Sequence, residues 1–212
     1  MRPTMPGAFS RSEGERAGTH LLVMLHGYGT GEERMESLFA TLPAGFTAAA
    51  PRGSLDVGDD VGWYLLDPGL RTEQGTVIAA ASGVLAWLDG VLATGPFRSV
   101  SLFGFSQGMA MATMLLRLRP DGFRCVTGIG GFVPDVELLA VTEPLPVRVP
   151  YLWQRGTADH MIHPGAVQDT QEWLTANTAL TRREFSDVGH VITPAMMVET
   201  DIFLREHVLD DG

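Results

Sequence analysis

The stretch SLFGFSQGMAMATMLL, residues 101–116, places one serine between two glycines inside a long apolar run. Its centre, GFSQG at 104–108, matches the pattern G-x-S-x-G, in which a strand turns sharply into a helix and exposes the serine. The glycines are expected because a Cβ at either position would strike the neighbouring strand or helix. Ser106 is therefore the candidate nucleophile, at the carboxyl end of a strand.

Short apolar runs alternate with longer helical patterns along the rest of the chain. Strands are expected at 20–25, 46–50, 99–103, 124–129, 147–154 and 181–185, and helices at 32–42, 76–93, 107–119, 165–177 and 194–208. Because the strands lack polar alternation and are separated by helices, they predict a mostly parallel sheet covered on both faces. The predicted fold class is α/β. Residues 52–75 form a long connection, and its Trp-Tyr-Leu-Leu cluster favours a loop packed over something.

The composition favours one globular domain whose partner is a small molecule. The chain has 212 residues, 45% of them hydrophobic, which is enough for one sizeable core. Its formal net charge of -10 argues against nucleic acid, because phosphate binding needs clustered Lys and Arg. We expect residues 1–18 to be a flexible N-terminal segment and residues 19–212 to form the single domain.

Cysteine content and hydropathy favour the cytoplasm. Cys125 is the only cysteine, which excludes an intramolecular disulfide and a Cys-rich metal site. The first 18 residues lack the apolar core of a signal peptide, and no later run of about 18 apolar residues is expected to span a bilayer. We therefore predict a cytoplasmic protein without stable membrane insertion, for which a homodimer is one compatible state.

A serine nucleophile needs a histidine base, which follows the serine and the acid in this architecture. His190 is the best base because it lies in the loop SDVGH, between the last expected strand and the last helix. His207 falls near the end of an amphipathic helix. His160 and His163 have the spacing of a metal pair, yet no further ligand cluster accompanies them. We predict no metal site.

Asp159 is the predicted acid that orients the base. It follows the strand expected at 147–154, and open α/β sheets keep their chemistry just beyond the carboxyl ends of strands. Its spacing from Ser106 and from His190 leaves room for one strand–helix unit per step. The other carboxylates at suitable places are Asp135 and Glu137, as second choice, and Asp187, which could instead cap a turn.

The oxyanion formed on attack needs aimed N–H donors. The backbone N–H of Gln107, next to the nucleophile, is one candidate. The loop LHGYGTG at 25–31 supplies the other, through the backbone N–H of Tyr28. A nucleotide-binding interpretation of this loop fails, because Glu32 occupies the sixth position of G-x-G-x-x-G and no Gly-Lys-Ser/Thr is present.

The chain resembles the phospholipase/carboxylesterase family of small α/β-hydrolases, which includes acyl-protein thioesterases and bacterial carboxylesterases. The resemblance is carried by LHGYG, APRG, GWY, GFSQGM, RGTADHMI and GHVI, in family order over most of the chain. It implies an α/β-hydrolase fold without a large lid domain. It also implies Ser106 as nucleophile, Asp159 as acid and His190 as base, with Tyr28 and Gln107 as the oxyanion donors.

The pocket is where this sequence departs from the family pattern. Tyr28 stands where the family commonly has Leu, and Arg155 replaces a histidine that often precedes the glycine of RGTAD. The bulky Tyr28 predicts a narrowed site that favours short acyl chains. The resemblance implies that Trp63 lines the acyl side. The candidate substrate-binding residues are Trp63, Leu65, Phe105, Phe132, Met161 and Ile162.

These observations predict a cofactor-free serine esterase that cleaves carboxylic esters, of short to medium acyl length, through an acyl-enzyme. Acyl-protein thioesterase and lysophospholipase activities are the alternatives within the family. A catalytically silent α/β-hydrolase domain that binds a ligand is the non-enzymatic alternative, and the complete set of triad residues counts against it. Perhydrolysis of acyl groups stays open as a side activity, whereas Ser106 disfavours dienelactone hydrolases, which use cysteine.

Overall fold

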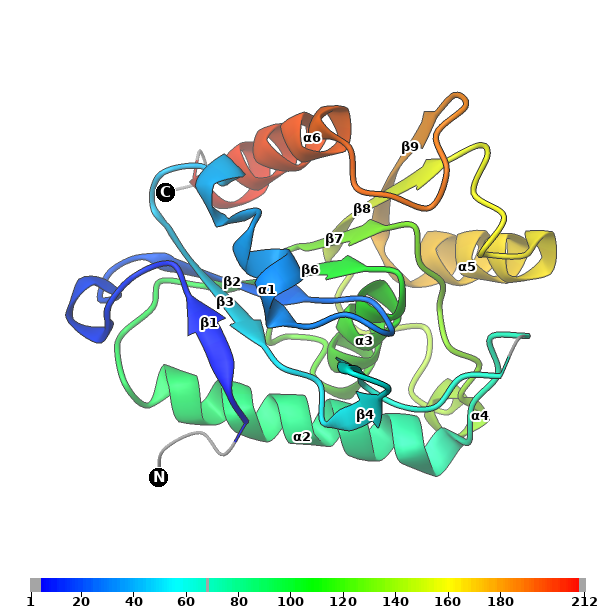
Figure 1. Cartoon of the computed structure of the whole chain (residues 1–212), viewed down its shortest axis with the longest axis horizontal. Coiled ribbons are helices and arrows are strands. Elements are labelled where there is room, and N and C mark those ends of the chain that lie inside the picture. The colour runs from blue at the N-terminus through cyan, green and yellow to red at the C-terminus, as the bar shows by residue number, and fades with distance from the viewer. Residues whose placement is uncertain (1–4, 68, 210–212) are drawn as a thin grey trace.

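The computed structural model describes residues 5–67 and 69–209, and within them a seven-stranded sheet forms the centre (Figure 1). Its strands are β1 (Gly7–Phe9), β2 (His20–Leu25), β3 (Phe46–Pro51), β6 (Val100–Phe105), β7 (Val126–Ile129), β8 (Pro150–Gly156) and β9 (Ala179–Phe185). Their order is β1-β3-β2-β6-β7-β8-β9, with β1 antiparallel to β3 and the other described pairs parallel. The predicted α/β class is confirmed.

Helices cover both faces of this sheet (Figure 1). They are α1 (Glu32–Glu36), α2 (Gln74–Leu92), α3 (Gln107–Leu118), α4 (Glu137–Ala140), α5 (Pro164–Asn177) and α6 (Pro194–Leu204). Met35 of α1 and Phe203 of α6 belong to one buried cluster. Trp87, Met114 and Leu174 bring α2, α3 and α5 into the other. Successive residues of β2 alternate between the two clusters, because neighbouring side chains of a strand point to opposite faces.

The N-terminal region differs from the sequence-based expectation. Residues 7–9 were expected to be flexible, but they form β1 at the edge of the sheet, with Gly7 opposite Pro51. Phe9 packs on Trp87 with ring centroids 6.2 Å apart, and the guanidinium of Arg16 lies 3.7 Å from the centre of its ring. The expectation of flexibility is therefore wrong for this strand, because backbone pairing and one aromatic anchor hold it. Residues 1–4 lie outside the described part.

The connection at 52–75 contains a hairpin that the sequence analysis missed. Its strands are β4 (Leu55–Val57) and β5 (Asp60–Gly62), which pair antiparallel as a separate two-stranded sheet. Each strand has only three residues, and acidic side chains interrupt them. Such short polar strands carry no periodic signal. The helix expected at 32–42 also divides, into α1 and a 3₁₀ turn at Phe39–Thr41, and the last helix ends in a π-helical turn at Arg205–Leu209.

One helix in the described part of the chain, α2, is long and apolar enough to cross a membrane by length and composition alone. The core helix of a soluble protein passes the same test, so the feature is weak evidence for a membrane span. One stripe of α2 is buried in the core, and its residues are Val77, Ala81, Val84, Trp87, Leu88 and Val91.

Candidate active site

Ser106 occupies the single position between the end of β6 and the start of α3. Its φ of 55° and ψ of -120° lie in a region that non-glycine residues adopt at a cost, as expected of a strained turn. A Cβ on Gly104 would collide with the backbone oxygen of Gly108, and a Cβ on Gly108 with that of Leu25 in β2. The prediction that only glycine fits on either side of the serine is confirmed.

Gly108→Ala is expected to destabilise the protein by about 3 kcal/mol, because the new methyl group has no room between α3 and β2. Gly83→Ala is the matched control, since nothing lies within 4 Å of a Cβ there. Alanine at this exposed position of α2 should instead stabilise by up to about 1 kcal/mol. Urea unfolding of both variants measures the difference. Equal stability of Gly108→Ala and the wild type would contradict this account of the elbow.

The structure brings together the serine, histidine and aspartate that the sequence predicted. His190 Nε2 lies 2.9 Å from Ser106 Oγ, and His190 Nδ1 lies 2.8 Å from Asp159 Oδ2. A carboxylate only accepts hydrogen bonds, so Nδ1 carries the imidazole proton and Nε2 is left to accept from the serine hydroxyl. The three residues follow β6, β8 and β9, whose carboxyl ends meet at one edge of the parallel sheet.

Asp159 is held in place by its own loop. Its side chain is 1% exposed. Oδ1 accepts hydrogen bonds from the backbone N–H of Met161 at 2.9 Å and of Ile162 at 3.4 Å. The Phe105 ring packs against the His190 imidazole, with centroids 5.0 Å apart. Acid and base are therefore both oriented before any substrate binds.

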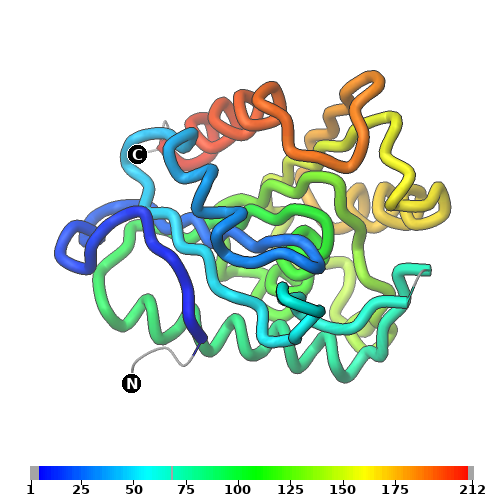
Figure 2. Tube along the Cα trace, in the orientation of Figure 1, coloured from blue at the N-terminus to red at the C-terminus, as the bar shows by residue number. Residues whose placement is uncertain are grey.

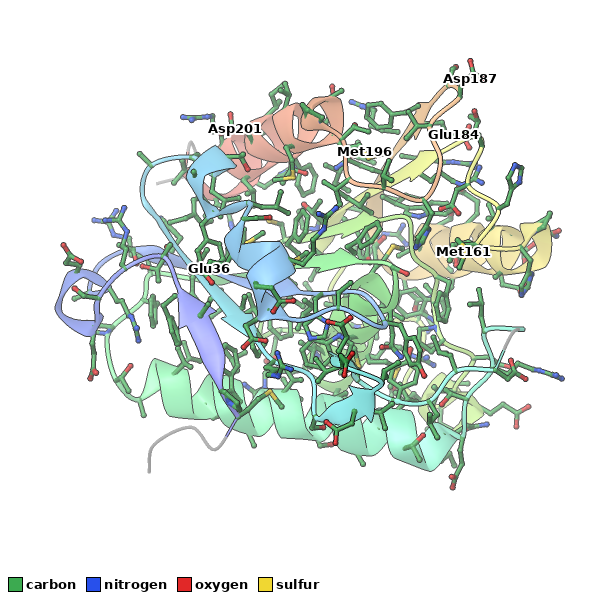
Figure 3. The ribbon with its side chains drawn as sticks, viewed as in Figure 1. Glu36, Met161, Glu184, Asp187, Met196 and Asp201 are labelled. Atoms are coloured by element: carbon green, nitrogen blue, oxygen red, sulfur yellow. The ribbon has the colours of Figure 1, made fainter. Side chains whose placement is uncertain are left out.

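The other carboxylates considered from sequence lie elsewhere. Figure 3 shows Asp187 at the outer end of the loop after β9, where its backbone N–H donates to Thr157 Oγ1. Asp135 and Glu137 are exposed and line a cavity of about 740 Å³ beside α5. No described hydrogen bond joins any of these three carboxylates to His190. The structure therefore separates Asp159 from the alternatives that spacing left open.

Two other histidines that follow Ser106 in the chain, His163 and His207, take part in other contacts. His163 caps α5 by accepting from the backbone N–H of Ala166 at 3.0 Å. The His207 ring packs on Phe203, with centroids 4.4 Å apart. Across residues 5–67 and 69–209, no group of three or more His, Cys, Asp or Glu side chains is arranged to hold a metal ion.

The loop after β2 carries the predicted oxyanion donor. His26 is fully buried, and burial lowers the pKa of its imidazole. Its Nε2 accepts from the backbone N–H of Gly53 at 2.9 Å, so the ring proton is on Nδ1, which donates to Gly27 O at 2.8 Å. The backbone N–H groups of Tyr28 and Gln107 have no acceptor among the described residues. Both are free to donate to a substrate oxygen.

The predicted substrate-binding residues range from buried to exposed, and Phe105 is half-buried. Phe132 and Ile162 are buried in the core cluster, whereas Leu65 and Met161 are 66% and 67% exposed. Trp63, which the resemblance places on the acyl side, is 3% exposed. Its Nε1 donates to the backbone oxygen of His26, and the two rings stack with centroids 4.6 Å apart. Trp63 therefore packs against His26, at the start of the loop that carries the Tyr28 N–H.

The sequence analysis missed the roles of two buried side chains beside this loop, those of His26 and Gln107. It weighed only the backbone N–H of Gln107, and it did not consider His26 beyond its place in the HGYG motif. Both side chains are fully buried. The available signal was a polar side chain in an otherwise apolar run, since buried polar groups need hydrogen-bond partners.

The fold and this site define an α/β-hydrolase. The chain belongs to the phospholipase/carboxylesterase family, whose sequence profile matches residues 73–208. No curated protein matches it. This membership makes the protein a hydrolase of the phospholipase/carboxylesterase type, which acts on small-molecule substrates.

Solved structures share the fold over nearly the whole chain. A carboxylesterase from Mesorhizobium loti superposes with a TM-score of 0.79 at 20% identity, covering 94% of each chain. Acyl-protein thioesterase 2 from Zea mays gives 0.75 at 20% identity, covering 96% of this chain and 99% of its own. The Bacillus cereus carboxylesterase gives 0.77 at 15% identity, covering 96% and 95%. The predicted fold without a large lid domain is confirmed.

Proposed function

We propose that this protein is a serine esterase that cleaves carboxylic esters of short to medium acyl length. The observation that carries the proposal is the continuous hydrogen-bond chain from Ser106 through His190 to Asp159. A serine hydroxyl is a weak nucleophile until an adjacent base accepts its proton. In this arrangement the base is in position and its other nitrogen is paired with a buried acid.

The proposed reaction proceeds in two acyl-transfer steps. His190 takes the hydroxyl proton as Ser106 Oγ attacks the carbonyl carbon, and the backbone N–H groups of Tyr28 and Gln107 hold the resulting oxyanion. His190 then protonates the departing alcohol or thiol. Water enters, loses a proton to His190 and attacks the acyl-enzyme, which releases the acid and restores the serine. Asp159 orients the imidazole throughout.

A substrate panel tests this function and its alternatives. Rates are measured on p-nitrophenyl esters of increasing acyl length, an acyl thioester and a lysophospholipid, before and after dialysis against EDTA. We expect turnover of the short esters and no loss with EDTA, since no step of the proposed reaction uses a metal. A dominant rate on the thioester or the lysophospholipid would favour those activities. Absence of turnover and of fluorophosphonate labelling would favour the silent binding domain.

Tyr28→Leu is expected to shift the acyl preference towards longer chains. The Tyr28 ring packs over Gly62, where a Cβ would lie 2.9 Å from Cδ2, and the residue is 38% exposed. A pocket gains about 0.8 kcal/mol, roughly fourfold in kcat/KM, for each methylene it buries, until the chain meets a wall. The wild-type profile should therefore rise and then fall, and Tyr28→Phe should leave it unchanged. A maximum that stays in place in Tyr28→Leu would contradict this assignment.

We also propose that the protein works in the cytoplasm. Cys125 is a free, buried thiol, and burial raises its pKa to about 11. Such a thiol is inert, and a chain with a single cysteine needs no oxidising compartment. Fractionation of cells that express the untagged chain tests this location, with recovery in the soluble cytoplasmic fraction as the expected result.

A further inference from the structure

The amide side chain of Gln107 is fully buried at the start of α3, where the proposed reaction uses only the backbone N–H of this residue. Its Oε1 accepts from the backbone N–H of Trp63 at 3.0 Å, and its Nε2 donates to the backbone oxygen of Tyr64 at 2.7 Å. The amide thus satisfies one donor and one acceptor of the same chain segment. It binds that segment to the residue next to the nucleophile.

The segment that Gln107 binds follows β5, and β5 is hydrogen-bonded to the loop that carries the Tyr28 N–H. Trp63 follows β5, and Val61 in β5 accepts hydrogen bonds from the backbone N–H groups of Gly29 at 2.9 Å and Thr30 at 3.2 Å. Figure 2 shows the loop after β2 running beside this hairpin. The loop that carries the Tyr28 N–H is therefore hydrogen-bonded to β5, and β5 is followed by the residues that Gln107 binds.

A second attachment holds the hairpin at both of its ends. Gly53, before β4, donates to the His26 imidazole, and Trp63, after β5, donates from its indole to the His26 backbone oxygen. A Cβ on Gly53 would collide with the backbone oxygen of Gly62, so the two ends approach each other closely. Both ends of the hairpin are therefore attached to His26, and movement of the Trp63 end would displace the oxyanion loop.

We propose that the Gln107 side chain is a positioning residue for the oxyanion site. Its backbone N–H supplies one donor, and its amide fixes the hairpin to which the loop carrying the other donor is bonded. Gln107 thus links the two donors, together with the attachments that His26 makes to the same hairpin. Oxyanion donors stabilise the transition state only when they are aimed at the charge that develops there. This inference rests on the proposed function.

Gln107→Met tests the role, because methionine keeps the side-chain length and removes both hydrogen bonds. Gln154→Met is the matched control: Gln154 is equally buried, and its amide bonds Thr200 on α6, away from the hairpin. We measure kcat and KM on a p-nitrophenyl ester, the affinity of a trifluoromethyl ketone whose adduct places an oxyanion in the site, and the unfolding midpoint.

The expected result for Gln107→Met is a kcat lower by about 10- to 100-fold, less than the complete loss of an oxyanion donor. KM should change by less than about twofold, and the ketone should lose affinity by the same factor as kcat, because both report the transition state. Gln154→Met should keep the wild-type kcat. A Gln107→Met enzyme with the kcat of Gln154→Met would overturn the proposal.

Two further measurements keep the test decisive. If Gln107→Met does not fold, Gly62→Ala perturbs the same place from the hairpin side, since its Cβ would lie 2.9 Å from Tyr28 Cδ2 and 3.3 Å from Gln107 Oε1, and a wild-type kcat in this variant overturns the role. Hydrogen exchange of the Trp63 amide should be faster in Gln107→Met, and unchanged exchange overturns the anchoring. A wild-type protein without ester turnover would instead defeat the proposed function, whereas the exchange result is independent of turnover.

Discussion

Ser106→Ala is expected to lower kcat by about 10⁶-fold on any ester that the wild type hydrolyses, because the attacking oxygen is lost and only binding and the oxyanion donors remain. The same variant should not react with a fluorophosphonate. The reason is geometric: Ser106 Oγ lies 2.9 Å from His190 Nε2, the nitrogen that is free to accept its proton.

The control for this prediction is Ser82→Ala. Ser82 is exposed on α2, and its hydroxyl donates to the backbone oxygen of Ile78. This variant should label and turn over like the wild type. Mass spectrometry of the labelled peptide identifies the modified serine. Labelling that persists in Ser106→Ala would show that another residue is the nucleophile.

Asp159→Asn is expected to lower kcat by about 10⁴-fold with little change in the unfolding midpoint. The asparagine carbonyl can still accept from the Met161 N–H, so the loop keeps its anchor. Its NH₂ group then faces His190 Nδ1, which must accept a hydrogen bond instead of donating one. The ring proton moves to Nε2, and the base can no longer take the serine proton.

The matched controls are Asp187→Asn and Asp135→Asn. Both carboxylates are exposed, and neither has a described hydrogen bond to His190. Steady-state kinetics should show kcat within about threefold of wild type for each, since surface substitutions away from a site have small effects. If either of them were the crippling change and Asp159→Asn the mild one, the assignment of the acid would be wrong.

The choice among the candidate acids shows what spacing along the chain cannot predict. Asp135, Glu137, Asp159 and Asp187 all follow expected strands at suitable places. Position along the chain places a residue near the active edge of the sheet but does not direct its side chain. Asp159 is distinguished because its backbone neighbours hold one carboxylate oxygen and leave the other facing His190. That direction arises from the folded loop.

The apolar residues predicted to bind the acyl chain show a second limit of prediction from sequence. Trp63, Phe132 and Ile162 are apolar residues near the site motifs, and apolar character predicts burial in a core and contact with an acyl chain equally well. All three are buried, whereas Leu65 and Met161 are exposed. The difference depends on which other segments cover each residue. That information is spread over the whole chain.

The sequence by itself determined the α/β class, the parallel strands and the turn that carries Ser106. These features rest on local rules: apolar periodicity selects strand or helix, and Gly104 and Gly108 are required by the tight turn between β6 and α3. Only the tertiary structure decided the edge strand β1, the β4–β5 hairpin and the contact of the Gln107 amide with residues 63 and 64. Each of these three features depends on hydrogen bonds to backbone groups. Because every residue carries such groups, no pattern of side chains along the sequence predicts these contacts.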